Sequence, residues 1–222
     1  ALPIDRKHLA TSFLSAVVAR YRGTVLGRQE LEGELIEDLP GALWTREMFR
    51  RWDDGATGRV VVAVDPPTTS NAQSDGCGIV VACRTEQGVA VLRDLTLRPA
   101  APLNWAARAV EAFHAHRADC IVAETNQGGD MVKAVLAQVD ANVPVRLVHA
   151  TRGKWVRAEP VAALYAQGRV VHAAGLTALE DELCNFGVDG LADGHSPDRV
   201  DALVWAVTEL MLRDAPRVRG TT

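Results

Sequence analysis

The chain has 222 residues, 48% of them hydrophobic and 23% charged, which is enough for one globular domain with a substantial core. Its formal net charge of −4 excludes a protein that binds nucleic acid by bulk positive charge, so such binding would need a local basic surface. No apolar run is long enough to span a membrane, and no signal-peptide pattern is present.

The four cysteines show neither CxxC nor zinc-type spacing. Three of them lie in apolar runs, where small buried thiols are expected. This cysteine usage predicts a reducing, cytoplasmic setting.

The first part of the chain, up to about residue 58, has helix-and-loop character. It contains the charged stretch 28–34 and a break at Leu39-Pro40-Gly41. We interpret residues 1–58 as a connector, residues 59–215 as the main domain and residues 216–222 as a C-terminal tail.

From residue 59, β-branched runs predict three successive strands, over 60–65, 78–83 and 89–97, which favours an antiparallel meander. After them, stretches with a helical period alternate with further apolar strands. This order indicates an α/β sheet of mixed direction flanked by helices. The expected later elements are helices at 104–116, 131–139 and 159–166, and strands at 120–124, 143–149 and 170–172.

The last predicted helix has a clear start signal. Ser196 is expected at its N-cap, Pro197 at its first position and Asp198 in its first turn. Apolar residues then recur at spacings of three and four. Asp198 and Asp201 are three residues apart, so both carboxylates lie on one face of this helix.

Two of the apolar strands end in an acid, Asp65 and Glu124. If these strands are parallel neighbours, both carboxylates lie at one edge of the sheet, where the last helix can add Asp198 and Asp201. Each acid alone also fits an ordinary role in a turn, a strand end or a helix N-terminus. Together the acids repel one another unless cations neutralise them, and hard divalent cations such as Mg²⁺ take oxygen ligands. Two such ions serve phosphodiester chemistry in many nucleases, so the cluster predicts that chemistry.

The arrangement resembles the RNase H-like nucleases: Val64-Asp65 at the end of the first strand, Ala123-Glu124-Thr125-Asn126 at the end of the fourth, and an aspartate on the final helix. Segments 21–34, 42–45, 154–160 and 198–203 are similar to the large terminase subunits of tailed phages and phage-like gene transfer agents. The resemblance runs from about residue 21 to residue 211 and keeps the family order of the motifs.

The resemblance implies an RNase H-like mixed sheet, with three antiparallel strands followed by parallel strands. In that family an N-terminal packaging ATPase is joined to a C-terminal nuclease that cuts concatemeric double-stranded DNA. This sequence has no G-x-x-x-x-G-K-[ST] phosphate loop, so we expect the nuclease half without ATPase activity, with residues 1–58 as the connector from the missing ATPase domain. The implied partners are double-stranded DNA, the packaging ATPase domain, the small terminase subunit and the portal. The implied location is the cytoplasm of a bacterial host, at the procapsid.

The motifs also imply the roles of the acids. Asp65, Glu124 and Asp198 match the metal-binding acids of the family. Asp201 matches a paired aspartate of RuvC-type resolvases, whereas some terminases have an apolar residue at that place. All four are expected to be catalytic and to hold two Mg²⁺ or Mn²⁺ ions.

A basic segment follows the strand predicted at 143–149. Lys154, with Arg152 and Arg157, could contact DNA phosphates or supply charge to the transition state, and a solvated basic loop is the alternative.

Two other functions stay open from the sequence. One is a RuvC-like resolvase or transposase-type nuclease of the same fold, which the segment around Gly27-Arg28-Gln29-Glu30 makes less favoured than a terminase. The other is a non-catalytic module that docks on DNA or on the portal, in which the acids are structural. Metal binding and plasmid nicking would distinguish a nuclease from such a module.

Overall fold

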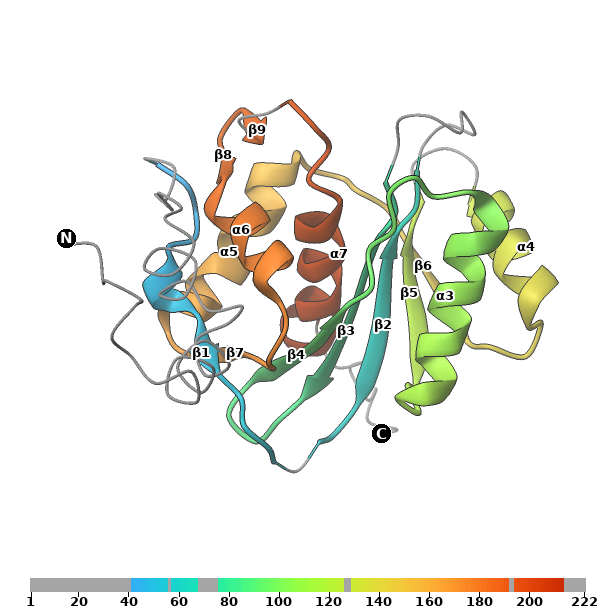
Figure 1. Cartoon of the computed structure of the whole chain (residues 1–222), viewed down its shortest axis with the longest axis horizontal. Helices are drawn as coiled ribbons and strands as arrows, with labels where there is room; N and C mark the ends of the chain where they lie inside the picture. The colour runs from blue at the N-terminus through green and yellow to red at the C-terminus, as the bar shows by residue number, and fades with distance from the viewer. Residues whose placement is uncertain (1–40, 56, 68–75, 126–128, 192–193, 214–222) are drawn as a thin grey trace, which may run out of the picture. The chain divides into compact units, whose positions relative to one another are not determined.

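Within the described residues, seven strands form one mixed sheet (Figure 1). The structure is a computed structural model that describes residues 41–55, 57–67, 76–125, 129–191 and 194–213. These residues belong to a compact unit that begins at Leu39. In spatial order the strands are β1 (Arg50–Arg51), β7 (Val170–His172), β4 (Val89–Asp94), β3 (Gly78–Arg84), β2 (Val60–Asp65), β5 (Cys120–Glu124) and β6 (Val145–Val148).

The directions of the strands follow the predicted pattern. β2, β3 and β4 form the antiparallel meander, while β5 and β6 continue the sheet in parallel beyond β2. β7 and β1 lie parallel to β4 on the other side. The expected sheet, three antiparallel strands followed by parallel ones, is therefore confirmed. β2 is buried on both of its faces, as its unbroken apolar run requires.

Helices α3 (Pro102–Ala115) and α4 (Gly129–Val139) cover one face of the sheet (Figure 1). Trp105 and Leu136 pack there in one apolar cluster with Val62 and its neighbours on alternate strand positions. This layer contains none of the four acids and serves as the support of the sheet.

Helices α5 (Lys154–Ala166), α6 (Thr177–Cys184) and α7 (Asp198–Val207) cover the opposite face (Figure 1). Val61 and Leu203 belong to the apolar cluster on this side. No helix in the described ranges is long and apolar enough to cross a membrane. The remaining short elements are η3 (Arg46–Met48), β8 (Phe186–Gly187), β9 (Gly190–Leu191) and η4 (Thr208–Leu212).

Two helices differ from the prediction. α5 begins at Lys154, five residues before the predicted start, because Pro160 is typical of a first helical turn but here lies inside the helix. The predicted basic loop is therefore wrong for Lys154 and Arg157, which lie in the first turns of α5. α6 has no counterpart among the predicted elements, since buried glutamates interrupt its apolar pattern.

The described end of the predicted connector packs into the same unit as the sheet. Trp44 is fully buried, and its ring lies 6.0 Å from that of Tyr165 in an edge-to-face arrangement. β1 pairs in parallel with β7, and the Trp52 N–H donates to the His172 carbonyl oxygen at 2.8 Å. Residues 1–40 and the predicted tail at 216–222 lie outside the described residues, so the connector over 1–58 stays a prediction.

Candidate active site

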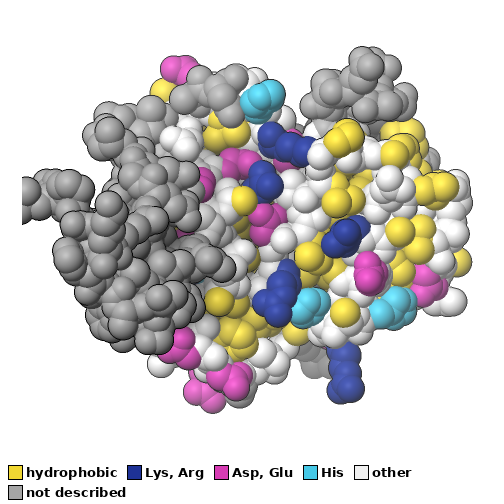
Figure 2. Space-filling model, in the orientation of Figure 1, with side chains coloured by type: hydrophobic (Ala, Val, Ile, Leu, Met, Phe, Trp, Pro, Cys, Tyr) yellow, Lys and Arg dark blue, Asp and Glu magenta, His cyan; other side chains and the backbone are white. Residues whose placement is uncertain are grey.

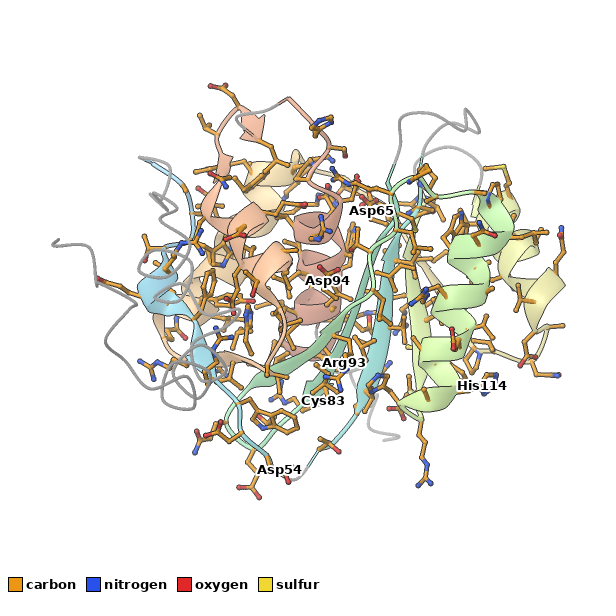
Figure 3. All side chains as sticks on the ribbon, in the orientation of Figure 1. Asp54, Asp65, Cys83, Arg93, Asp94 and His114 are labelled. Carbon is orange, nitrogen blue, oxygen red and sulfur yellow. The ribbon has the colours of Figure 1, made fainter. Side chains whose placement is uncertain are left out.

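Two of the predicted acids lie at neighbouring strand ends. β2 and β5 pair in parallel, in a register that places Asp65 and Glu124 next to each other at one edge of the sheet. Side chains alternate along a strand, and the residues two positions before each acid belong to the apolar cluster under α7. Both carboxylates therefore belong to the face that α7 covers, and Figure 3 shows Asp65 there.

Helix α7 brings Asp198 and Asp201 to the same edge, and only 4% and 2% of these residues are exposed. The helix can approach this closely because β3 begins with a glycine. A Cβ on Gly78 would collide with the carbonyl oxygen of Asp198, and a Cβ on Gly76 would collide with the Asp198 carboxylate. Two glycines thus permit the close contact between strand and helix that places the third and fourth acids.

The start of α7 differs from the predicted cap. The helix begins at Asp198, and Pro197 before it makes no side-chain capping bond. Instead, Glu182 of α6 accepts hydrogen bonds from the backbone N–H groups of Arg199 (2.8 Å) and Val200 (3.2 Å). The prediction of Ser196 as N-cap is wrong, because a carboxylate distant in sequence satisfies the first donors of the helix.

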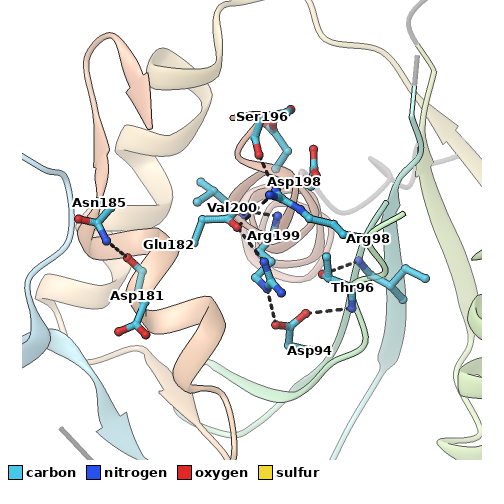
Figure 4. Close-up of polar contacts among 12 residues, drawn as sticks. Asp94, Thr96, Arg98, Asp181, Glu182, Asn185, Ser196, Asp198, Arg199 and Val200 are labelled. Atoms are coloured by element: carbon cyan, nitrogen blue, oxygen red, sulfur yellow. Dashed lines mark hydrogen bonds and ion pairs between the residues drawn. The ribbon is translucent and has the colours of Figure 1, made fainter. Parts of the chain in front are cut away.

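A network of ion pairs holds the first turn of α7 (Figure 4). Arg199 Nε donates to Asp94 at the end of β4 (2.7 Å), and its Nη1 donates to Glu182 (3.1 Å). Arg98 Nη2 lies 2.9 Å from Asp198 Oδ2. Figure 2 shows acidic and basic side chains gathered over the upper end of α7. Strand β4 and helix α6 thus fix the helix end that carries Asp198.

Cationic side chains lie between the acids. Arg157 donates to Glu124 (3.2 Å) and to Asp201 (3.0 Å), and only 9% of its side chain is exposed. Lys154 Nζ lies 2.5 Å from Asp201 Oδ2, and the Trp205 indole N–H donates to Glu124 at 2.5 Å. In the part of the chain that the structure describes, no three acidic, histidine or cysteine side chains form a ready set of metal ligands. Their oxygens are instead paired with these cations.

Two buried carboxylate oxygens, Asp198 Oδ2 and Asp201 Oδ2, accept no hydrogen bond from the described residues. Each lies at ion-pair distance from a cation, Arg98 or Lys154, but outside hydrogen-bond geometry, so the contacts supply charge without a directed donor. A buried carboxylate oxygen without a donor is costly. A divalent cation takes such oxygens as ligands, so the donor set fits an ion of this kind.

The repulsion among the acids is visible in their pKa values. Desolvation raises the pKa of Asp65 well above its ordinary value of 3.8, and the charges of Asp201 and Glu124 raise it further. Desolvation also raises the pKa of Asp201, although the positive charges of Lys154 and Arg157 oppose the change. The folded protein therefore disfavours full ionisation of the cluster, as expected for acids that a cation would neutralise.

Asp65→Asn is expected to stabilise the metal-free protein at neutral pH. Because the pKa of Asp65 is raised on folding, the folded state binds the proton more tightly than the unfolded chain. Stability therefore falls as the pH rises from the ordinary value of 3.8 towards the raised one. Asparagine lacks the charge, so its gain in melting temperature in EDTA should be larger at pH 8 than at pH 5. Equal gains at both pH values would contradict the raised pKa.

The three basic residues predicted to contact DNA have different surroundings. Arg152 is exposed in the segment before α5, and 45% of the Lys154 side chain is exposed beside Asp201. Arg157 is buried among the acids, so its first role in this structure is to compensate their charge. Contact of these residues with DNA stays a prediction.

Three polar residues that contact the acids were not found from the sequence, namely Arg98, Glu182 and Trp205. Trp205 had a usable signal, because it lies four residues after Asp201 and so on the same face of α7. Arg98 and Glu182 come from segments whose contact with α7 is set only by the tertiary fold.

Solved structures of terminase nucleases share this fold. The large terminase nuclease from thermophilic phage G20c has a TM-score of 0.58 at 15% sequence identity, with 76% of this chain and 98% of that chain covered. The human cytomegalovirus terminase nuclease domain has a TM-score of 0.51 at 13% identity, with coverages of 73% and 92%. A large terminase from a second thermophilic bacteriophage has a TM-score of 0.58 at 11% identity, and 95% of this chain covers 54% of that one. A comparison by sequence with curated proteins gives no match.

The model of the terminase RNaseH-like domain family matches residues 62–210. This range contains the meander, the parallel strands β5 and β6, helix α7 and all four acids at the shared edge. The resemblance inferred from the sequence motifs is confirmed, and the structural neighbours confirm the RNase H-like fold. The chain therefore belongs to the terminase RNase H-like domain family.

Proposed function

We propose that this chain is a divalent-metal-dependent endonuclease that cuts concatemeric double-stranded DNA during phage-type genome packaging. The observation that carries the proposal is the meeting of four acids, Asp65, Glu124, Asp198 and Asp201, from β2, β5 and α7 at one edge of the sheet. Membership of the terminase family supports the packaging role.

The four acids would hold two Mg²⁺ or Mn²⁺ ions. Solved structures of the G20c large terminase nuclease with bound magnesium and with bound cobalt support the use of a divalent cation. When bound, such ions stabilise charge on phosphate oxygens and lower the pKa of water for attack at phosphorus. The carboxylates of this chain would determine where those positive charges lie relative to the phosphodiester.

The side chains around the acids have separate tasks in this proposal. Trp205 orients Glu124 through the indole hydrogen bond. Arg157 compensates the charge of Glu124 and Asp201 from a buried position. Lys154 is exposed enough to exchange its contact with Asp201 for a substrate phosphate, which an ammonium group binds as a compact point charge.

The chain would act as the nuclease half of a large terminase. Its coverage of 54% of the large terminase from the second thermophilic bacteriophage supports this division. Because the sequence contains no phosphate loop, the chain would hydrolyse no ATP on its own. It would work beside a packaging ATPase domain, a small terminase subunit and a portal.

The test is cleavage of supercoiled plasmid by the purified chain. With Mn²⁺ or Mg²⁺ the plasmid should be nicked and then linearised with little sequence preference, and with EDTA it should stay intact. Cutting that persists in EDTA would refute metal dependence. Absence of both Mn²⁺ binding and nicking would favour a docking module, and strong preference for four-way junctions over linear duplex would favour a resolvase.

A further inference from the structure

A second basic cluster lies on the same side of the sheet as the acids, around Glu209 of η4. Arg59 and Arg146 donate to Glu209 Oε1 at 2.9 and 2.7 Å, and Arg213 donates to Oε2 at 3.1 Å. Only 3% of the Glu209 side chain is exposed, whereas the arginine side chains are 47%, 37% and 47% exposed. We call Arg59, Arg146 and Arg213 the arginine triad.

The arginine triad carries more positive charge than its buried partner neutralises. Three guanidinium groups face one carboxylate, which leaves an excess of 3 − 1 = 2 charges. Adding Arg84, which donates to the Leu210 carbonyl oxygen, and Asp119, whose charge acts on Arg59, leaves the same excess. One arginine would suffice to compensate Glu209, so the other two exceed what the buried acid requires.

The triad is also prepared to bind an anion. Among the described contacts, each of its arginines uses one nitrogen on Glu209, and a guanidinium group has five N–H donors. Glu209 is buried and holds all three heads, so part of the side-chain entropy that anion binding costs has already been lost on folding.

A pocket of about 250 Å³ connects the triad with the candidate active site. Arg146, Arg213, His149 and Trp205 line it, together with residues of β6. Trp205 also donates to Glu124, so one wall of the pocket is a side chain of the site itself. β6 is the last strand of the sheet, and the pocket therefore lies at the sheet edge nearest the acids of β2 and β5.

The separation of the two sites matches a DNA backbone. Asp198 and Glu209 are 11 residues apart on consecutive helical elements, which is about 16 Å at 1.5 Å per residue. A duplex rises about 3.4 Å per base pair, so this length corresponds to about five base pairs. We propose that the arginine triad binds the phosphate backbone of the same duplex whose scissile phosphate lies at the acids. This inference rests on the proposed function.

The experiment measures binding of a long fluorescent duplex by anisotropy in EDTA over a range of salt concentrations. For the double variant Arg146→Gln/Arg213→Gln we expect weaker binding and a slope of log K against log salt that is smaller by about 2, because two phosphate contacts are lost. In Mn²⁺, the variant should also need more protein for half-maximal plasmid cleavage.

Two matched variants control for charge and for folding. Arg146→Lys/Arg213→Lys keeps the charge and should keep the salt slope of the parent. Arg93→Gln/Arg108→Gln removes two exposed arginines of β4 and α3 and should change neither binding nor cleavage. If the double glutamine variant melts too low for assay, Arg213→Gln alone, which leaves two arginines on Glu209, should lower the slope by about 1.

The outcomes separate this inference from the proposed function. A parent that fails to cut plasmid in Mn²⁺ would refute the nuclease. A parent that cuts, together with a triad variant whose affinity and salt slope equal those of the Arg93→Gln/Arg108→Gln control, would overturn only the phosphate-binding role of the triad.

Discussion

Asp65→Asn, Glu124→Gln and Asp198→Asn are each expected to slow plasmid cleavage at least about a thousandfold, equivalent to about 4 kcal/mol of transition-state stabilisation. Each substitution keeps the shape of the side chain and removes the negative charge that a divalent cation requires of its ligands. The measurement is the rate at which supercoiled plasmid disappears in Mn²⁺, with the melting temperature in EDTA as the check on folding. Asp54→Asn is the matched control, since Figure 3 shows Asp54 at the opposite end of the sheet from Asp65.

Asp201→Asn separates two interpretations of the last helix. Asp201 already pairs with Lys154 and Arg157, so its loss resembles the loss of a supporting group, for which about a 10- to 100-fold effect is usual. Full activity of Asp198→Asn combined with an inactive Asp201→Asn would mean that the third ligand is assigned one helical turn too early. That result would favour the resolvase alternative.

The acids could be located from the sequence because they mark the ends of unbroken apolar strands. Buried strands of a parallel pair carry no polar residue until they emerge, so Asp65 and Glu124 stand out at the ends of β2 and β5. The spacing of three between Asp198 and Asp201 added the helix face. Local periodicity was therefore sufficient to predict the sheet, its order of directions and the side of the sheet on which the site lies.

The supporting contacts could not be predicted, because they join segments far apart in the chain. Glu182 caps a helix that begins 16 residues later, and Arg98 reaches Asp198 across 100 residues of sequence (198 − 98). Periodicity reports neighbours within about one helical turn and carries no information on such pairs. Pro160 misled the prediction for a local reason, since its usual position is a first helical turn.

Arg157→Met is expected to lower the free energy of unfolding in EDTA by about 3 to 5 kcal/mol. Arg157 bridges Glu124 and Asp201, whose side chains are 5% and 3% exposed, and its guanidinium lies 4.9 Å from the centre of the Trp205 ring. Methionine has a similar length but no charge, so two buried carboxylates lose their partner. Removal of one member of a buried ion pair usually costs this much, because the charge that stays behind is uncompensated. Urea unfolding at neutral pH measures the change.

Lys154→Met is the matched control, because Lys154 lies on the same helix and pairs with the same Asp201 but has 45% of its side chain exposed. An exposed pair contributes about 1 kcal/mol or less, so this variant should unfold close to the parent.

Addition of Mn²⁺ makes the prediction for Arg157 specific to a metal site. A ligand that binds only the folded state stabilises it according to its concentration relative to Kd. In Arg157→Met the cation would replace a missing positive charge, so Mn²⁺ should raise the stability of this variant more than that of the parent or of Lys154→Met. Equal stabilisation of all three proteins by Mn²⁺ would place the cation away from Glu124 and Asp201. Equal stability of Arg157→Met and the parent in EDTA would show that burial of the two acids does not depend on the guanidinium.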